Sequence, residues 1–286
     1  MESSGNALIE KNIMSEKKYL QINNSTWYCI SLFYSHKDIA VLMESVALFY
    51  LENKTSINHI SIYLSNAKGE RLNIVIVSEH EDKEFMCHQI HDYFSKVIKN
   101  HPSEADSAIQ YGNMIWMDYP NNSIAWNVFD IPDFLLENQE VCLFSMYMSL
   151  LIMDLYDEES SIYDNKKTII FFLVLQLIKA LNVDIATVFA TANSEDNDVV
   201  DMIDDTTDSL QTMSSYWDFN DDTDSNFDLW LEQIKRINNS MNWGEKYHLL
   251  TSVICSQLDI LPSYLQSDII PLLVKWNKWR NQSGLS

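Results

Sequence analysis

Short runs of β-branched and aromatic residues alternate with longer amphipathic stretches in the first half of the chain. Five such runs predict strands, at 26–34, 58–65, 71–78, 113–119 and 123–130. Apolar residues recur every three or four positions over 38–51 and 82–100, which predicts two helices. The segment 66–70, which contains Gly69, predicts a hairpin turn. The order strand, helix, strand, strand, helix, strand is the ferredoxin-like arrangement.

The second half of the chain has helical periodicity almost throughout. Helices are predicted at 135–156, 165–182, 226–241, 243–259 and 263–281. Ser263, directly after Pro262, is the expected N-cap of the last helix. The fold class predicted is therefore α+β, with a ferredoxin-like N-terminal sheet and its helices followed by a mostly helical C-terminal half.

A polar leader and an acidic loop flank or interrupt this pattern. Residues 1–20 are predicted to be a flexible leader, and 21–286 a single α+β domain. The stretch 194–228 holds twelve acidic residues and no lysine or arginine, which favours a solvated loop. Within it, Asp218-x-Asn220-x-Asp222 begins like a calcium loop, but threonine stands at the glycine position and leucine at the final glutamate position. An EF-hand is excluded, and weak cation association stays open.

Charge and composition exclude several classes of function. The 286 residues include 41 acidic and 19 basic side chains, for a net charge of −22, and only three arginines. Nucleic-acid binding needs clustered cations, and docking to an anionic membrane needs the same, so neither is expected. Only five glycines are present, without a phosphate-binding or dinucleotide motif. No cofactor is predicted.

The cysteines and apolar runs favour a cytoplasmic protein. The four cysteines are widely spaced and form no Cys-x-x-Cys pair, which is typical of a reduced protein. The longest apolar run, 169–178, is too short to span a bilayer. His88 and His91 lie one helical turn apart beside Cys87, but no second ligand pair accompanies them, so ordinary helix histidines are favoured over a metal site.

Several segments follow one order of motifs that is known from a protein family. They are Trp27–Tyr34, Ile60–Leu64, Arg71–Val75, Phe129–Asp133, Phe144–Ser145 and 247–260. In this order the chain resembles the glutamate-elimination domain of lantibiotic dehydratases, a module that also occurs alone as the thiopeptide-type bacteriocin biosynthesis family. The resemblance could extend over residues 26 to 282.

The departures from that family shift the functional expectation. Asn73 and Val75 replace arginines of the family's strand, and Ile254 and Asp259 stand where a histidine and an arginine are expected. Expelling glutamate needs cationic or hydrogen-bonding partners, which this chain largely lacks. It is closer in type to the thiopeptide pyridine synthases. That resemblance implies a formal [4+2] aza-cycloaddition of two dehydroalanines, followed by loss of water and of the leader peptide.

The resemblance also suggests candidate site residues. Tyr247 and Ser252 would donate hydrogen bonds that favour the imidic-acid tautomer of the diene amide, and His248 is an acid/base candidate. Asp130 or Asp133 would carry a proton during aromatisation. The alternative for each is a structural role, as packing residue, helix surface or cap.

A second set of candidates would bind the peptide. Lys68 and Arg71, beside the predicted hairpin, would bind the leader of the modified precursor peptide. Trp276 is either a wall of the peptide site or a packing residue.

Two alternatives to the cyclase function remain. The chain could be a non-catalytic member of a maturation complex, binding the peptide or other maturation enzymes. It could instead eliminate glutamate with a rearranged site, which would require Arg71, Arg236 and Arg280 to converge. The oligomeric state stays open, with a homodimer among the choices.

Overall fold

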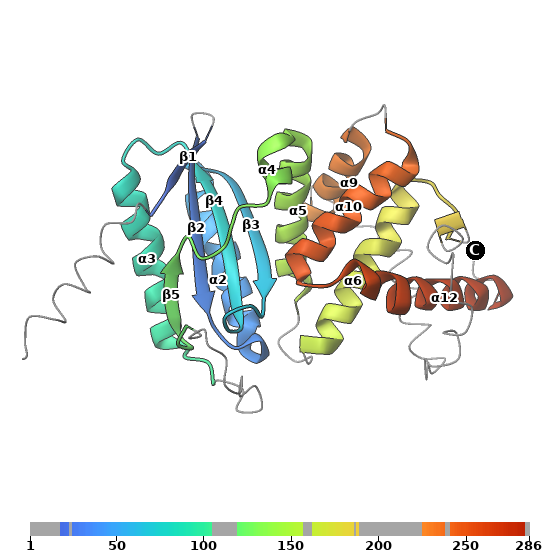
Figure 1. The fold of residues 1–286 in the computed structure, drawn as a ribbon, viewed down its shortest axis with the longest axis horizontal. Helices are drawn as coiled ribbons and strands as arrows, with labels where there is room; N and C mark the ends of the chain where they lie inside the picture. Colours follow the sequence, from blue (N-terminus) through green and yellow to red (C-terminus); the bar gives the residue numbers. More distant parts are fainter. Residues whose placement is uncertain are drawn as a thin grey trace, which may run out of the picture.

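The computed structural model describes residues 18–22, 25–104, 119–156, 162–185, 187–188, 225–237 and 241–283, with the backbone alone at 162–165. Most of the predicted leader, most of the predicted strand at 113–119 and the acidic stretch up to residue 224 lie outside these ranges, and so does the calcium-like run. Figure 1 shows a sheet with its helices on one side of the molecule and a group of helices on the other. The predicted fold class, α+β with a mostly helical second half, is confirmed.

The strands of the N-terminal half form one sheet, and after the short first strand the elements follow the predicted ferredoxin-like order along the chain. Its strands are β1 (Leu20–Ile22), β2 (Ser25–Phe33), β3 (Ile57–Ser65), β4 (Arg71–Ser78) and β5 (Ser123–Trp126). All neighbours are antiparallel, and β4 lies between β2 and β3. The outer edge of β2 is shared, because β1 pairs with its start and β5 with its end. Strand β1 was not predicted, since three residues carry no recognisable alternation.

Strand β5 is shorter than the predicted strand at 123–130. It ends before Asn127, whose φ of 54° lies in the left-handed region and turns the chain out of the sheet. Asparagine tolerates this conformation better than other residues with a side chain. The next residues therefore cross the sheet as an irregular segment that leads to the helical half.

Two helices and a short 3₁₀ turn complete the sheet layer. They are η1 (His36–Asp38), α2 (Ile39–Asn53) and α3 (Lys83–Asn100). The Asp82 side chain accepts a hydrogen bond from Phe85 N–H and so caps α3. Buried side chains of both helices, such as Val46 and Phe94, share one hydrophobic cluster with Ile30 of β2. Helices α2 and α3 therefore cover the same face of the sheet.

The second half contains the predicted helices with shifted ends. Its elements are α4 (Asp133–Glu137), α5 (Gln139–Leu155), α6 (Ile162–Ala180), α9 (Asn226–Arg236), α10 (Trp243–Leu258), α11 (Pro262–Tyr264), η3 (Leu265–Ile269, a π-helical turn) and α12 (Ile270–Ser283). The single helix predicted at 135–156 is broken at Asn138, whose side chain caps α5 by accepting from Glu140 N–H and Val141 N–H. None of the helices in the described ranges is both long and apolar enough to cross a bilayer.

A buried hydrogen-bond network joins the sheet to the helical half. Helices α5 and α10 lie against β3, as Figure 1 shows. Gln257 of α10 donates through Nε2 to Ser145 Oγ at 2.6 Å and to Ser149 Oγ at 2.9 Å. Ser149 Oγ accepts from Ile62 N–H at 3.1 Å, and Tyr63 Oη lies 3.2 Å from Ser145 Oγ. Because buried polar groups need partners, this network fixes how α10 sits on the sheet.

We expect Trp230→Ala to lower the free energy of unfolding by about 3–5 kcal/mol, the usual cost of removing a buried aromatic ring. Trp230 is fully buried, and its ring centroid lies 5.7 Å from that of Phe144 and 6.3 Å from that of Phe227. Trp230→Phe is the matched control: it keeps an aromatic ring and removes an indole N–H that has no partner, so its cost should be clearly smaller. Urea unfolding measures both, and equal losses would contradict the packing role.

Candidate active site

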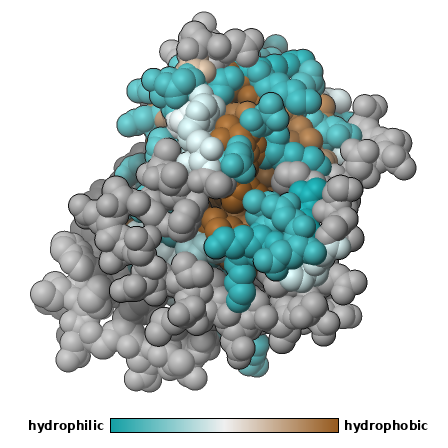
Figure 2. Space-filling model, turned by 90° about the vertical axis from the view of Figure 1, so that its right-hand side faces the viewer, coloured by the Kyte–Doolittle hydropathy of each residue, from teal (hydrophilic) through white to brown (hydrophobic). Residues whose placement is uncertain are grey.

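Helix α10 and the turn that follows it enclose a pocket of about 220 Å³. Its lining residues are Val188, Tyr247, His248, Thr251, Ser252, Cys255, Pro262, Leu265, Gln266 and Ile270. Three of the predicted site residues, Tyr247, His248 and Ser252, are thus brought together. Figure 2 shows hydrophobic surface set among hydrophilic side chains on this end of the molecule. A concave, mostly apolar pocket with a few polar groups is the usual form of a small-ligand site.

The local sequence explains why these side chains share one wall. Residues 247, 251 and 255 are spaced by four and therefore lie along one face of α10. Asn242 and Glu245 form a capping box that fixes where α10 begins. Asp259, with a φ of 50°, ends the helix and turns the chain back, so that η3 forms the opposite wall. Such π-helical turns occur frequently at functional sites.

Tyr247 is the most unusual polar group of the pocket. It is 7% exposed, and its phenol oxygen is buried without a hydrogen-bond partner. Burial raises the pKa of this phenol to about 12, so it keeps its proton at neutral pH. Buried polar atoms are nearly always hydrogen-bonded. An unpaired donor in the wall of a pocket is therefore a candidate for a hydrogen bond to a ligand.

The other polar groups of the pocket differ in how exposed they are and in whether they already form hydrogen bonds. His248 is exposed, and its ring lies edge-on to that of Tyr247, with 5.9 Å between centroids. Ser252 Oγ donates to the Leu249 carbonyl at 2.6 Å, so its proton is already engaged while its lone pairs stay open. Burial raises the pKa of the Cys255 thiol to about 11, which keeps it protonated. The pocket therefore combines an exposed imidazole with an unpaired phenol that is buried in its wall.

Sequence reasoning missed Thr251 and Cys255 as members of this site. Thr251 is buried and donates through Oγ1 to the Tyr247 carbonyl at 2.7 Å. Both residues follow from Tyr247 by steps of four, so the helical period could have indicated them. The π-helical turn has no comparable sequence signal.

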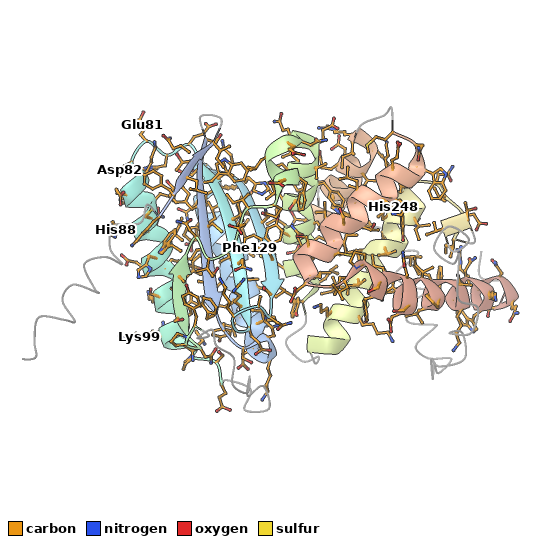
Figure 3. The ribbon with its side chains drawn as sticks, viewed as in Figure 1. Glu81, Asp82, His88, Lys99, Phe129 and His248 are labelled. Carbon is orange, nitrogen blue, oxygen red and sulfur yellow. The ribbon has the colours of Figure 1, made fainter. Side chains whose placement is uncertain are left out.

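The two predicted aspartates lie elsewhere. Asp130 is exposed on the segment that leads into α4, Asp133 is exposed as the first residue of α4, and neither lines the pocket. Figure 3 marks their neighbour Phe129 over the sheet, whereas His248 lies in the helical half. Cys29 donates through Sγ to the Phe129 carbonyl at 3.0 Å, and burial, with a smaller effect of Asp130, raises the pKa of Cys29 to about 12.

The predicted peptide-binding residues are also distributed over the molecule. Lys68 is exposed in the turn between β3 and β4, with a φ of 61°. Arg71 is 5% exposed; it donates to the Ala67 carbonyl and lies 5.6 Å from the ring centroid of Phe33. Trp276 is fully buried in α12 and meets Phe171 edge-on. In this conformation Lys68 is the member of the set that faces solvent.

The three arginines have separate surroundings. Arg71 belongs to β4, Arg236 pairs with Glu232 on α9, and Arg280 lies over the ring of Trp276 on α12. Figure 1 shows these elements in different parts of the molecule. Across the ranges that the structure describes, the arginines thus form no joint cationic cluster. The same ranges contain no group of three or more histidine, cysteine or acidic side chains that could hold a metal ion.

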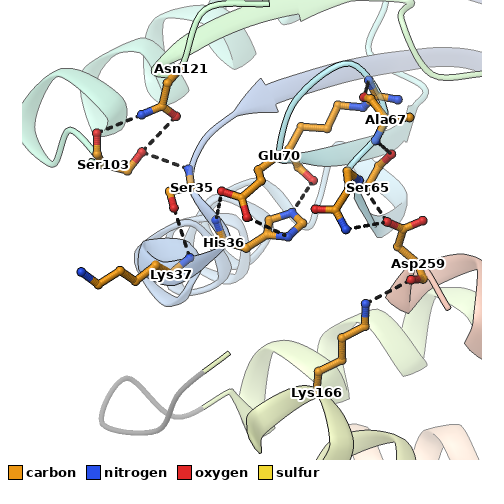
Figure 4. Close-up of polar contacts among 12 residues, drawn as sticks. Ser35, His36, Lys37, Ser65, Ala67, Glu70, Ser103, Asn121, Lys166 and Asp259 are labelled. Carbon is orange, nitrogen blue, oxygen red and sulfur yellow. Dashed lines mark hydrogen bonds and ion pairs between the residues drawn. The ribbon is translucent and has the colours of Figure 1, made fainter. Parts of the chain in front are cut away.

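The end of α10 is fastened to the sheet by polar contacts drawn in Figure 4. A carboxylate oxygen of Asp259 accepts from Asn66 N–H at 3.0 Å and from Asn66 Nδ2 at 3.2 Å. Lys166 Nζ donates to the Asp259 carbonyl at 3.1 Å. The β3–β4 turn and α6 therefore both hold Asp259, the residue at which α10 ends.

We expect Asp259→Ala to lower the free energy of unfolding by about 1–2 kcal/mol, because it removes two charge-assisted hydrogen bonds at a solvent-exposed site and puts alanine in the left-handed region. Asp259→Asn keeps an acceptor and tolerates that conformation, so its effect should be less than half as large. Urea unfolding with unchanged m-value measures both. An alanine variant as stable as the parent protein would show that the hydrogen bonds from Asn66 to the Asp259 side chain, drawn in Figure 4, contribute nothing.

Comparison with known proteins identifies a solved structure with the same fold. No family model matches the chain, and no curated protein matches it. A solved structure of an enzyme that forms pyridine rings does match, with a TM-score of 0.58 over 91% of this chain and 99% of its own. That structure is described as "Pyridine synthase, TbtD, from thiomuracin biosynthesis". At 11% identity the match shows a shared fold.

Proposed function

We propose that this protein is a maturation enzyme for a ribosomally made, modified peptide, and that it forms the central pyridine of a thiopeptide-type macrocycle. The observation that carries the proposal is the match to the pyridine synthase fold over nearly the full length of both chains. The pocket on α10 supports it, because it combines an apolar cavity with a proton donor and an acid/base group, which is what such chemistry requires.

In the proposed reaction the pocket holds two dehydroalanines of one peptide close together. The Tyr247 phenol donates a hydrogen bond to the amide oxygen next to the first dehydroalanine and stabilises the imidic-acid tautomer, a 2-azadiene. Two new C–C bonds join the methylene carbon and the imidic-acid carbon of this azadiene to the two carbons of the second olefin, which gives a six-membered ring that contains the azadiene nitrogen. Loss of water and then of the leader peptide as its amide yields the aromatic pyridine. The steps move protons and electron pairs within the substrate, so no oxidant is consumed.

We assign the proton transfers of aromatisation to His248, which lies at the pocket beside Tyr247. Ser252 Oγ accepts a hydrogen bond from the peptide backbone, while its own O–H group continues to donate to the Leu249 carbonyl. Asp130 and Asp133 lie outside this pocket, so the proposed mechanism does not use them.

A non-catalytic role in a maturation complex is the second candidate. The hydrophobic surface seen in Figure 2 favours it, because an apolar patch can dock a peptide or a partner enzyme. Residual glutamate elimination has less support, since the described arginines do not converge.

The test is mass spectrometry of the purified protein with a thiazole-containing, bis-dehydroalanine peptide that still carries its leader. A pyridine-containing macrocycle together with a free leader amide is expected. Binding of the peptide without turnover would support the docking role instead. Absence of both binding and turnover would overturn the proposed substrate class.

A further inference from the structure

Strand β5 presents backbone hydrogen-bonding groups at the edge of the sheet. One edge of β5 pairs with β2, and no other described strand pairs with its opposite edge. Asn127 N–H donates to the Cys29 carbonyl at 2.9 Å. Because hydrogen-bonded pairs alternate along an antiparallel ladder, Ala125 also binds β2, whereas Ile124 and Trp126 direct their N–H and C=O groups away from the sheet. These outward groups can pair with an incoming strand.

Helix α3 runs beside this edge and forms a groove with it. The groove encloses about 340 Å³ and is lined by His91, Ser95, Ile98, Lys99, Pro102, Asn122 and Ile124. Two buried polar atoms next to it have no hydrogen-bond partner, His91 Nδ1 and Trp126 Nε1. Buried donors and acceptors are usually paired, so these two atoms leave unused hydrogen-bonding capacity in the side chains beside the groove. We call this feature the β5–α3 groove.

The β5–α3 groove is cationic in a strongly acidic protein. Lys18 Nζ lies 5.7 Å from the ring centroid of Trp126, and Lys99 is exposed on the lining. Figure 3 marks Lys99 and His88 along the length of α3. Two acidic side chains lie near the lining, Asp92, which neighbours His91 on the helix, and the exposed Glu104, two residues after Pro102. The whole protein has a net charge of −22. Lys18 and Lys99 therefore make the groove a place on its surface that attracts anions.

We propose that the β5–α3 groove binds an extended acidic peptide segment, which adds to the sheet as a strand alongside β5. Backbone pairing with Ile124 and Trp126 supplies affinity, and alternate side chains of the bound segment point toward α3. Carboxylates on that face meet Lys18 and Lys99. This binding is separate from the pocket on α10, so it does not depend on the proposed reaction.

Fluorescence anisotropy of a labelled peptide in which glutamate and valine alternate over eight residues tests the backbone pairing. Ile124→Pro removes the outward N–H, and Ile124→Ala removes the same side chain but keeps that N–H. Proline is tolerated where a strand's N–H faces solvent, so both variants should fold, which circular dichroism checks. We expect Ile124→Pro to weaken binding about 10-fold relative to Ile124→Ala, the loss that one hydrogen bond near 1.4 kcal/mol produces. Equal affinities would overturn strand addition.

The charge requirement is tested with the same peptide. Lys99→Glu should weaken binding about 5- to 10-fold at low salt, an effect that shrinks as salt screens the charges. Lys54→Glu, an equally exposed change at the end of α2, should leave affinity unchanged. A peptide with lysine in place of glutamate should not bind. If it binds as tightly, or if both variants behave alike, the proposed acidic partner is wrong, whatever the turnover assay shows.

Discussion

Tyr247→Phe is expected to lower the rate of pyridine formation about 10²- to 10³-fold, the usual effect of removing one preorganised donor from a reaction that develops charge on oxygen. The ring stays in place, so packing of the 7%-exposed side chain is retained. Only the phenol that lacks a partner in the structure is lost. Because the protein gains no cavity and loses an unpaired polar atom, its stability should be unchanged or slightly higher.

Single-turnover kinetics with the bis-dehydroalanine peptide measure this effect on the bond-forming step. Tyr264→Phe is the matched control, since Tyr264 belongs to α11 just beyond the pocket lining, and its rate should equal that of the parent protein. If Tyr247→Phe turns over at the parent rate, the phenol has no part in the chemistry. The hydrogen-bond donor to the amide oxygen would then lie outside α10.

The second large effect concerns acid stability and arises at His59. This residue of β3 is 4% exposed, and burial lowers its pKa to about 3. The Cys142 sulfur lies 3.3 Å from Nδ1, and Nε2 lies 3.0 Å from Ser61 Oγ, which suits a neutral imidazole. The unfolded chain binds a proton near pH 6.5, whereas the folded protein resists protonation down to about pH 3. Stability is therefore unaffected above pH 6.5 and falls below it, by up to about 1.4 kcal/mol per pH unit.

The parent protein and His59→Gln should differ in how steeply the free energy of unfolding falls as the pH is lowered. His59→Gln keeps hydrogen-bonding groups and cannot take up a proton, so its free energy of unfolding should decline less steeply between pH 6.5 and pH 4. His88→Gln is the control, because His88 is exposed on α3 and stays in contact with water after folding. Urea unfolding at several pH values gives all three slopes. A His59→Gln slope equal to that of the parent protein would show that His59 is not held neutral by burial.

The sequence predicts those helices and strands whose ends are marked by a local pattern of apolar and turn residues. Strand β4 was predicted at its observed bounds because its flanking turn and its β-branched run both mark the ends. The break at Asn138 and the early end of β5 at Asn127 were missed, because each depends on a side-chain cap or a left-handed residue inside an apolar run.

The candidate site was predictable only in part. Tyr247, His248 and Ser252 follow one another closely on one helix, so the sequence could group them once a family pattern pointed there. Their opposite wall comes from the π-helical turn, which has no local signature. Asp130 and Asp133 were grouped with them although the chain carries those aspartates over the sheet, a separation that only the tertiary fold determines.

A crystal structure of the protein with the finished pyridine macrocycle tests the proposed site most directly. The ring is expected between α10 and the π-helical turn, with a macrocycle oxygen or nitrogen within hydrogen-bond distance of the Tyr247 phenol and a second polar atom near His248. A macrocycle bound at the sheet beside Asp130, or no macrocycle bound at saturating concentration, would contradict the assignment of this pocket as the place where the pyridine forms.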